Sequence, residues 1–384
     1  MNILYDRNMT LGEALFPRLG RAVPVEGRTL SQSDLAGCDL LFVRSTCRLG
    51  RDLLEGTPVR FIGSGVAGTD HIDFEALLAL GIPVVSAPGC NAESVADYVV
   101  AALLHLARRQ GRSWRGTTLG IVGVGHVGSF VKTFAEEALG MKTLCCDPPR
   151  KETGDPAAQD FLTFEEILPR VDVLTFHTPL TDDGPYPTRR LFDDAAAEKL
   201  KPGATLLNFA RGSICDNALL LRLLEEGRLA DAAIDCWEGE PHISPALAAR
   251  AALATPHIAG HAYEGRANGT LAVYRAACDF LGRPAGDTPP FPPAPIPELA
   301  LDCRGRALDD LLAEAVLATC DICGDSRRFK ADPSAFDAQR RTVPHRRLFS
   351  GTTLRLAGAA PETAAAFQAL GFVCLPDGER GETP

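Results

Sequence analysis

The chain of 384 residues lacks the features that mark several special classes of protein. It contains no apolar run near the roughly 20 residues of a membrane-spanning helix, and its first residues, MNILYDRN, carry no signal-peptide pattern. It has no excess of positive charge: the net charge of −10 argues against nucleic-acid and anionic-membrane partners. Internal repeats of about 20–50 residues are also missing. We therefore expect a cytoplasmic globular protein, and its length predicts two or three domains.

Disulfide and metal-binding patterns are missing too, although cysteine itself is abundant. Most of the 12 cysteines, such as Cys145, Cys146 and Cys236, lie in or beside apolar strand-like runs, which is typical of reduced, buried thiols. Cys320 and Cys323 form a single CxxC, with no second pair at zinc spacing. We interpret these two as thiols on one helical turn and expect no bound metal.

What the chain does contain is a dinucleotide-binding pattern near residue 120. An apolar run from Leu119 to Val122 enters a turn with three glycines, and an amphipathic segment and a second apolar run follow. The first glycine permits the tight turn, the second lets the backbone approach a pyrophosphate, and the third lets the helix pack closely on the strand. The alternative is a glycine-rich turn that binds nothing. The three glycines are Gly123, Gly125 and Gly128.

Asp147 predicts which dinucleotide binds. It ends the second apolar run, 19 residues after Gly128, where a carboxylate accepts hydrogen bonds from both ribose hydroxyls and repels a 2′-phosphate. The backbone N–H groups at the start of the helix would face the phosphates. The sequence therefore predicts NAD rather than NADP.

The order of apolar runs predicts an α/β protein with doubly wound parallel sheets, in which one domain is inserted into another. We expect a flavodoxin-like substrate (lid) domain of residues 1–93 and 257–283, and a Rossmann domain of residues 94–256, with a ligand cleft between them. A long helix is expected over about 94–107. The expected strands cover residues 3–5, 40–43, 59–62, 84–86, 171–176, 205–209 and 232–235.

A different kind of sequence begins after residue 283. The proline-rich segment 284–297 predicts a stiff, extended linker, because proline fixes φ and lacks an N–H donor. Residues 298–384 are too apolar for a disordered tail and predict a small α+β module. Within it, 307–322 is typical of an amphipathic helix, and 348–358 and 371–375 are typical of strands. An apolar helix face on a stiff linker predicts a homodimer, paired through this module.

Three polar residues follow apolar strand-like runs and have the chemistry of a dehydrogenase: Arg211, Glu240 and His257. The carboxyl ends of parallel strands line the ligand crevice of such a sheet. A hydroxyl must lose its proton as hydride leaves its carbon, and histidine can take that proton near neutral pH. A carboxylate behind the imidazole would orient it, and the arginine fork would bind a substrate carboxylate. Singly, each residue has a purely structural interpretation; together they predict a catalytic site.

The arrangement GVGHVG … Asp147 … HTPLT … NFARG … IDCWEGEP … TPHIAG resembles the D-isomer-specific 2-hydroxyacid dehydrogenases over roughly residues 35–280. The resemblance implies that Arg211 and Glu240 are catalytic, that His257 is the acid/base, and that NAD is the cofactor. Further cofactor contacts carried over from the family are His126, Val127, Asp147, Thr178, Phe209, Ala210, Asp235 and Gly260.

The resemblance also implies residues that contact the substrate. Ser45 matches a substrate-binding position, whereas Val66 stands where a threonine is expected and His261 where a tyrosine is usual. Either of the last two could instead pack in its loop or face solvent. Arg44 could bind a substrate phosphate, and the cluster His345-Arg346-Arg347 is either a second phosphate site or a solvated patch.

Within the family, the likeness is nearest to a member that oxidises a small phosphorylated 2-hydroxy acid and has a C-terminal dimerisation module. The motifs VRSTCR at 43–48 and CDPPR at 146–150 are among those that point to it. Two alternatives stay open: a dehydrogenase of the phosphoglycerate, lactate or glyoxylate type, and an NAD-sensing binding protein similar to transcriptional corepressors. The C-terminal module argues against the first, and the complete Arg–Glu–His set argues against the second.

Overall fold

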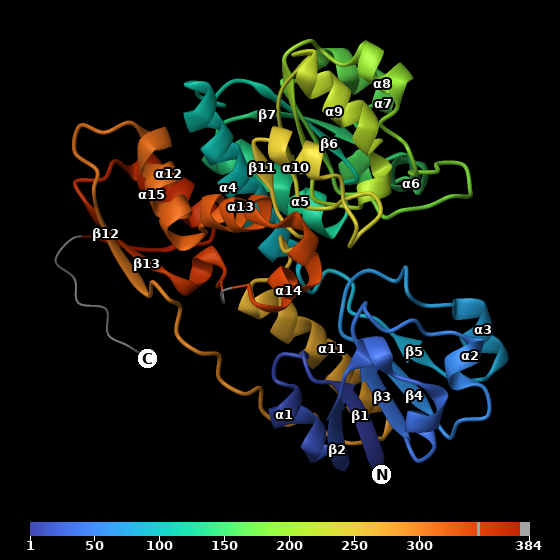
Figure 1. The fold of residues 1–384 in the computed structure, drawn as a ribbon. Helices are drawn as coiled ribbons and strands as arrows, with labels where there is room; N and C mark the ends of the chain where they lie inside the picture. Colours follow the sequence, from blue (N-terminus) through green and yellow to red (C-terminus); the bar gives the residue numbers. More distant parts are fainter. Residues whose placement is uncertain (344–345, 377–384) are drawn as a thin grey trace. The chain divides into compact units, whose positions relative to one another are not determined.

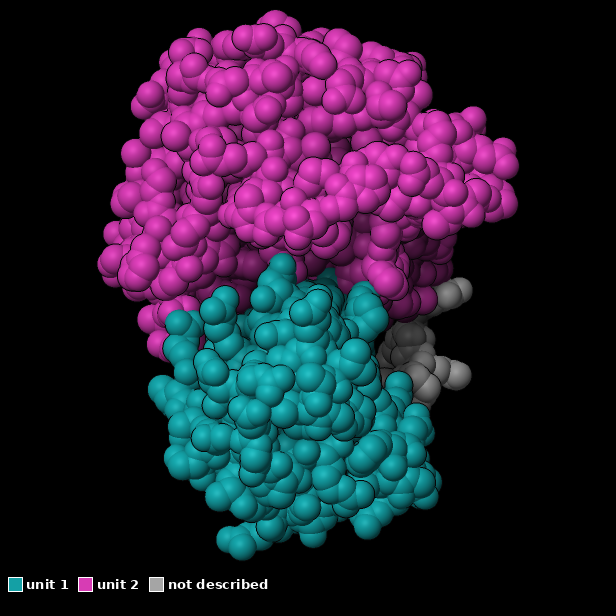
Figure 2. Space-filling view, turned by 90° about the vertical axis from the view of Figure 1, so that its right-hand side faces the viewer, with its two compact units in different colours: residues 1–91, 262–292 teal, residues 92–261, 293–384 magenta. Residues whose placement is uncertain are grey.

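The computed structural model describes residues 1–343 and 346–376. The chain forms two compact units, residues 1–91 with 262–292, and residues 92–261 with the described residues from 293 onward; Figure 2 colours them separately. The second unit thus contains the loop after residue 256, which we expected in the first domain, and also the C-terminal module. No helix among the described residues has the length and apolar content needed to cross a membrane.

The first unit is built on a five-stranded parallel sheet with the strand order β2-β1-β3-β4-β5 (Figure 1). The strands are β1 (Asn2–Asp6), β2 (Arg21–Val25), β3 (Leu40–Val43), β4 (Phe61–Ser64) and β5 (Val84–Val85). The helices are α1 (Gly12–Leu15), α2 (Arg51–Leu54), α3 (Phe74–Ala79) and α11 (Tyr263–Phe280). Strand β2 was not predicted from the sequence, because it is a largely exposed edge strand that contains Pro24.

Helix α11 returns to this unit and packs closely on β4. The approach requires a glycine at the contact: a Cβ on Gly63 would lie 2.7 Å from the Phe42 side chain and 2.8 Å from that of Val273. Phe42 also stacks on Phe16, with ring centroids 4.2 Å apart. These side chains form the core between helix and sheet.

The second unit contains a six-stranded parallel sheet with the order β11-β10-β9-β8-β6-β7. Its strands are β6 (Thr118–Val122), β7 (Lys142–Cys146), β8 (Val173–Phe176), β9 (Ala204–Asn208), β10 (Leu229–Ile234) and β11 (Leu253–Ala254). Its helices are α4 (Ala92–Gln110), α5 (His126–Thr133), α6 (Pro148–Glu152), α7 (Phe164–Ile167), α8 (Asp194–Lys199), α9 (Asn217–Glu225) and α10 (Pro245–Arg250). Because β6 lies between β7 and β8, the strand order reverses there, and such a switch point is where dinucleotides bind.

The C-terminal module has the predicted α+β composition. A parallel sheet of β12 (Glu298–Asp302), β13 (Thr353–Ala357) and β14 (Val373–Pro376) carries helices on one side (Figure 1). The helices of the module are α12 (Leu308–Thr319), α13 (Ile322–Ala331), α14 (Phe336–Arg341) and α15 (Pro361–Ala369), of which α12 and α15 pack on this sheet and α13 packs on β11.

The apolar face of α12 is buried inside this chain. Helix α12 packs on α4, and Leu311, Leu312 and Val316 belong to the same core cluster as the apolar residues of α4. A second copy of the chain is therefore not needed to cover this face, so the apolar face of α12 no longer supports the predicted homodimer.

Two interpretations of the C-terminal sequence were wrong. Arg346 is not part of a solvated patch: its guanidinium lies 4.6 Å from the centre of the Tyr98 ring and donates to Ser94 Oγ at 3.1 Å and to the Ala259 carbonyl. His345 of the same cluster lies outside the described residues. Cys320 and Cys323 do not share a helical turn either, because α12 ends before Cys320 and α13 begins after it. The expectation of buried thiols at Cys145, Cys146 and Cys236 is confirmed, and no disulfide joins the twelve cysteines.

The shared core between α12 and α4 predicts a large effect of a single truncation. Leu312→Ala, at a fully buried position, should destabilise the second unit by about 2–5 kcal/mol, since it removes apolar contacts and leaves a cavity. Differential scanning calorimetry would report this as a lower Tm. The matched control is Leu78→Ala, at a position that is 83% exposed. Equal Tm values for the two variants would contradict the shared core.

Candidate active site

The glycine turn after β6 has the geometry of a phosphate cradle. Gly123 has a φ of 85°, which only glycine adopts readily, and a Cβ there would meet the backbone of His177 and Thr178 at 2.8 Å. A Cβ on Gly128 would lie 2.1 Å from the Gly123 carbonyl oxygen, so α5 lies directly on the turn. By contrast, a Cβ on Gly125 would meet no atom within 4 Å, so its surface is open to a ligand. His126 and Val127 begin α5, whose first N–H groups have no partner within the helix.

Asp147 follows β7 and fixes this turn. Its Oδ2 accepts from the Val124 amide at 2.8 Å, and its Oδ1 accepts from the Arg150 amide at 3.1 Å, which caps α6. The carboxylate thus stands beside the glycine turn with acceptor capacity left for ribose hydroxyls.

The loop after β8 supplies polar groups on the other side of the turn. Thr178 Oγ1 is a buried atom with no hydrogen-bond partner among the described residues, so it is available to a bound cofactor. The neighbouring His177 bonds Thr175 through Nε2 at 3.0 Å, and burial lowers its pKa to about 3. His177 therefore stays neutral.

A pocket of about 380 Å³ lies between the chain after β7 and the loop after β8. Pro149, Thr181 and Tyr186 are among its lining residues, and the Tyr186 hydroxyl donates to Glu152. Its lining residue Pro149 lies two residues after Asp147 in the chain. Sequence reasoning missed Tyr186, because nothing in its local sequence links it to the segment after β7.

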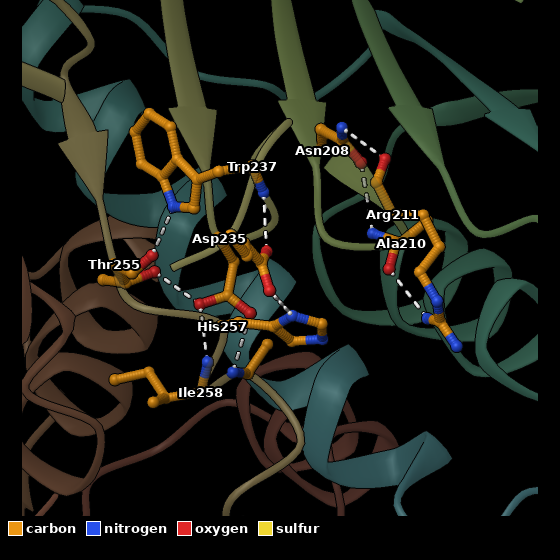
Figure 3. Close-up of polar contacts among 10 residues, drawn as sticks. Asn208, Ala210, Arg211, Asp235, Trp237, Thr255, His257 and Ile258 are labelled. Carbon is orange, nitrogen blue, oxygen red and sulfur yellow. Dashed lines mark hydrogen bonds and ion pairs between the residues drawn. The ribbon is translucent and has the colours of Figure 1, made fainter. Parts of the chain in front are cut away.

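His257 and Glu240 form a hydrogen-bonded pair (Figure 3). His257 Nδ1 lies 2.8 Å from Glu240 Oε2, while Glu240 Oε1 accepts from the Trp237 amide at 2.8 Å. Burial acts to raise the pKa of Glu240, but the net shift is downward because His257, the Trp237 amide and Arg340 stabilise the carboxylate. The pair is thus an oriented imidazole backed by an ionised carboxylate, the arrangement of a general base.

Asp235, which follows β10, holds the loop that carries His257. Its Oδ1 accepts from Thr255 Oγ1 at 2.6 Å and from the Ile258 amide at 2.8 Å, and its Oδ2 accepts from the Ala259 amide at 2.9 Å. Burial raises the pKa of Asp235, although His257 and these hydrogen bonds act in the opposite direction. Both carboxylate oxygens are therefore already engaged, so any cofactor contact here would share them.

Arg211 follows β9 at the same edge of the sheet (Figure 3). The buried Asn208 shapes this segment: its Nδ2 donates to the Arg211 carbonyl at 3.0 Å and its Oδ1 accepts from the Ala210 amide at 3.2 Å. The ring of Phe209 packs against Tyr98, with centroids 6.0 Å apart, and both Phe209 and Ala210 are buried. The segment therefore presents the Arg211 side chain on a rigid support.

Two further residues near the pair were not singled out from the sequence. Trp237 supplies the amide that bonds Glu240, and its indole donates to the Thr255 carbonyl at 2.8 Å. The positive charge of Arg340, on α14, lowers the pKa of Glu240, although Arg340 lies about 100 residues further along the chain. Such a distance in sequence leaves no local signal that could have identified Arg340.

In the first unit, the expected substrate residues lie on neighbouring loops. Arg44 and Ser45 follow β3, Val66 follows β4, and these strands pair with Val43 opposite Ser64. Ser45 is exposed, and the Val66 carbonyl accepts from the Ala87 amide at 3.1 Å.

Gly260 and His261 end the stretch of the second unit that follows His257. The His261 amide donates to the Ile258 carbonyl at 2.9 Å, which closes a turn directly after the loop held by Asp235. The two positions therefore stand at the carboxyl edge of the sheet, beyond β11.

Comparison with known proteins covers nearly the whole chain, including the C-terminal module. Residues 95–259 match the family model for the NAD-binding domain of D-isomer specific 2-hydroxyacid dehydrogenases. The chain is 42% identical over 377 residues to the erythronate-4-phosphate dehydrogenase of Cronobacter sakazakii, covering 97% of this chain and 98% of that protein. The enzyme of the same name from Salmonella arizonae is 42% identical over 379 residues, with the same coverage.

Solved structures share the fold over less of the chain. A glyoxylate reductase from Paecilomyes thermophila superposes with a TM-score of 0.61 at 26% identity, over 74% of this chain and 96% of that one. The NAD+-bound 3-phosphoglycerate dehydrogenase of Entamoeba histolytica gives a TM-score of 0.62 at 25% identity, over 73% of this chain and 95% of that one.

The second and third glycines of the turn, Gly125 and Gly128, predict different outcomes for the same substitution. Gly128→Ala should lower the Tm of the protein, because its Cβ meets the Gly123 carbonyl oxygen at 2.1 Å. Gly125→Ala should keep the parent Tm, since its Cβ has open space, yet bind NAD at least about 10-fold more weakly, equivalent to about 1.4 kcal/mol. Calorimetry and isothermal titration would separate the two effects. Parent-like NAD affinity in Gly125→Ala would show that the cofactor does not approach this turn.

Proposed function

The chain belongs to the erythronate-4-phosphate dehydrogenases, within the D-isomer specific 2-hydroxyacid dehydrogenases, and from this premise we propose that it oxidises 4-phospho-D-erythronate to (R)-3-hydroxy-2-oxo-4-phosphooxybutanoate. NAD is the cofactor, and the reaction belongs to the biosynthesis of pyridoxal 5′-phosphate. The observation that carries the proposal is the 42% identity over 97% of the chain, which includes the C-terminal module. The solved glyoxylate and phosphoglycerate enzymes match only about three quarters of it.

In the proposed mechanism, His257 removes the proton of the substrate 2-hydroxyl through Nε2, the ring nitrogen that faces away from Glu240. Glu240 keeps the imidazole in one orientation and stabilises the positive charge that it acquires. NAD supplies the acceptor for the hydride that leaves the same carbon. In the reverse direction, His257 returns the proton.

Arg211 binds the substrate carboxylate and stabilises negative charge on the reacting oxygen. The support for this role is the rigid segment that Asn208 shapes around it. Asp235 and Trp237 are positioning residues. Asp235 holds the loop that carries His257, and the Trp237 amide donates to Glu240.

The substrate phosphate adds negative charge, so a chain of net charge −10 needs a local cation to bind it. We assign that role to Arg44, with Ser45 and the amide of Val66 as further contacts in the first unit. This grouping is supported by the position of the three residues on the two loops that follow the paired strands β3 and β4. Arg346 is left out of it, because its guanidinium is already engaged by Ser94 and Ala259.

The enzyme also acts as a homodimer in this proposal, paired through the C-terminal module. The support for the dimer is the exposed face of the module's sheet, because the apolar face of α12 is covered within the chain. On the face away from the helices, Ala300, Arg355 and Leu375 lie side by side in register, and Val373 is 48% exposed. A second copy of this face would cover those side chains by twofold pairing.

The catalytic pair predicts a hierarchy among three substitutions. His257→Ala should lower kcat about 100-fold or more while leaving NAD affinity unchanged, because it removes the base but not the cradle. Glu240→Gln should also lower kcat, because a neutral amide stabilises the charged imidazole less. Glu238→Gln, in the same loop, is the control and should turn over as the parent does. Steady-state NADH formation with 4-phosphoerythronate measures all three, and a fully active His257→Ala would rule out the assignment.

The dimer predicts a change in sedimentation when charge enters the exposed sheet face. Val373→Asp should convert the protein to a monomer at micromolar concentration, since a buried unpaired carboxylate opposes association. Leu78→Asp, at an 83% exposed position in the first unit, should remain dimeric. Sedimentation velocity gives both masses. A parent protein that sediments as a monomer would refute the dimer itself.

A further inference from the structure

The described residues contain one group of three metal-binding side chains whose ligand atoms all lie within 4.8 Å of one another: the thiol of Cys236, the carboxylate of Glu240 and the imidazole of His257. Glu240 and His257 have roles in the proposed reaction. Cys236 has none, and it follows Asp235 directly beyond β10.

The three side chains differ in their access to solvent. The side chains of His257 and Glu240 are 32% and 23% exposed, whereas Cys236 is buried, with an exposure of 1%. An ion from solution would therefore meet the imidazole and the carboxylate first and the thiol beneath them. The site is a shallow, open one rather than a sealed cage.

The donor set identifies the class of ion. Thiolate, imidazole and carboxylate are the ligands of Zn²⁺, and three protein ligands leave a fourth tetrahedral position for water. Mg²⁺ and Ca²⁺ prefer six or more oxygen ligands, which this group does not offer. Zinc bonds of about 2.0–2.3 Å bring ligand atoms to within about 4 Å of one another, so the atoms that are farthest apart here must approach by up to about 1 Å. Rotation of the partly exposed Glu240 and His257 side chains can supply that movement.

Burial and charges of both signs act on the thiol of Cys236. Burial raises the pKa of Cys236 well above its usual value, and Asp235 and Glu240 add to the shift, whereas Arg211 and Arg340 oppose it. Without a metal the thiol therefore stays protonated. On coordination it forms the sulfur–metal bond as a thiolate and releases its proton to solvent.

We propose that Cys236, Glu240 and His257 form an inhibitory binding site for Zn²⁺ and similar divalent ions. The ion takes Nδ1 of His257 and so replaces the hydrogen bond to Glu240. The imidazole then loses the orientation and the charge partner that the base requires, and turnover stops. The inhibition rests on the proposed function, whereas binding of the ion does not.

Binding is tested first, without reference to activity, with Co²⁺ in place of Zn²⁺ and the full-length reduced protein. Titration should give one tight site per chain and a thiolate-to-cobalt charge-transfer absorption. Cys236→Ala should lose that absorption, and Cys215→Ala, which removes another buried thiol, should keep it. His257→Ala should bind at least about 10-fold more weakly.

A second thiol must be distinguished in the same titration. Cys323 Sγ lies 3.0 Å from His105 Nδ1, a Cys–His pair outside the active site. If the absorption disappears in Cys323→Ala and persists in Cys236→Ala, the ion binds that pair and the proposal is overturned. An unchanged Co²⁺ affinity and spectrum in Cys236→Ala would overturn it as well.

Inhibition is tested next. Zn²⁺ should inhibit the parent and Cys215→Ala, EDTA should restore activity, and Cys236→Ala should retain basal activity but need at least about 10-fold more Zn²⁺. Equal Zn²⁺ sensitivity of Cys236→Ala and the parent would contradict the inhibitory role. If Cys236-dependent Co²⁺ binding is seen but no 4-phosphoerythronate is oxidised, the metal site stands and the proposed function fails.

Discussion

The buried carboxylate of Asp235 is the interaction on which the candidate active site depends. It accepts hydrogen bonds from the Thr255 hydroxyl and from the Ile258 and Ala259 amides, on either side of His257. His257 has a φ of 55°, a left-handed conformation that costs free energy for a residue other than glycine. The hydrogen bonds to Asp235 hold that conformation, and the imidazole is thereby aimed at Glu240. The buried carboxyl group of Asp235 thus holds a loop with a strained backbone.

The C-terminal module also holds the loop that carries His257. Arg346 donates to the carbonyl of Ala259, two residues after His257, and lies over Tyr98 of α4. Trp237, which bonds Glu240, packs against Phe329 of α13, with ring centroids 5.8 Å apart. The module is therefore part of the architecture of the candidate active site within one chain.

The elements that sequence reasoning identified well are those set by short-range constraints. The spacing of Gly123 and Gly128 follows from one turn between a strand and a helix, and the structure has that turn with the close contacts that glycine permits. Helix α4 follows from hydrophobic periodicity, and strands β6 to β10 follow from short apolar runs. The edge strand β2 was missed because it is exposed and has no such pattern. The CxxC was misread because Asp321 caps α13 between its two thiols.

The sequence by itself determined the family, the cofactor fold and the residue types of the candidate site, because each is encoded in motifs of a few adjacent residues. Only the tertiary structure decided which side chains meet. Glu240 and His257 are 17 residues apart and come together because they follow neighbouring parallel strands. The burial of Arg346 and the approach of Cys236 to the His257–Glu240 pair depend on packing between distant segments. Local pattern cannot reveal such contacts, because their free energy arises only once the whole unit has folded.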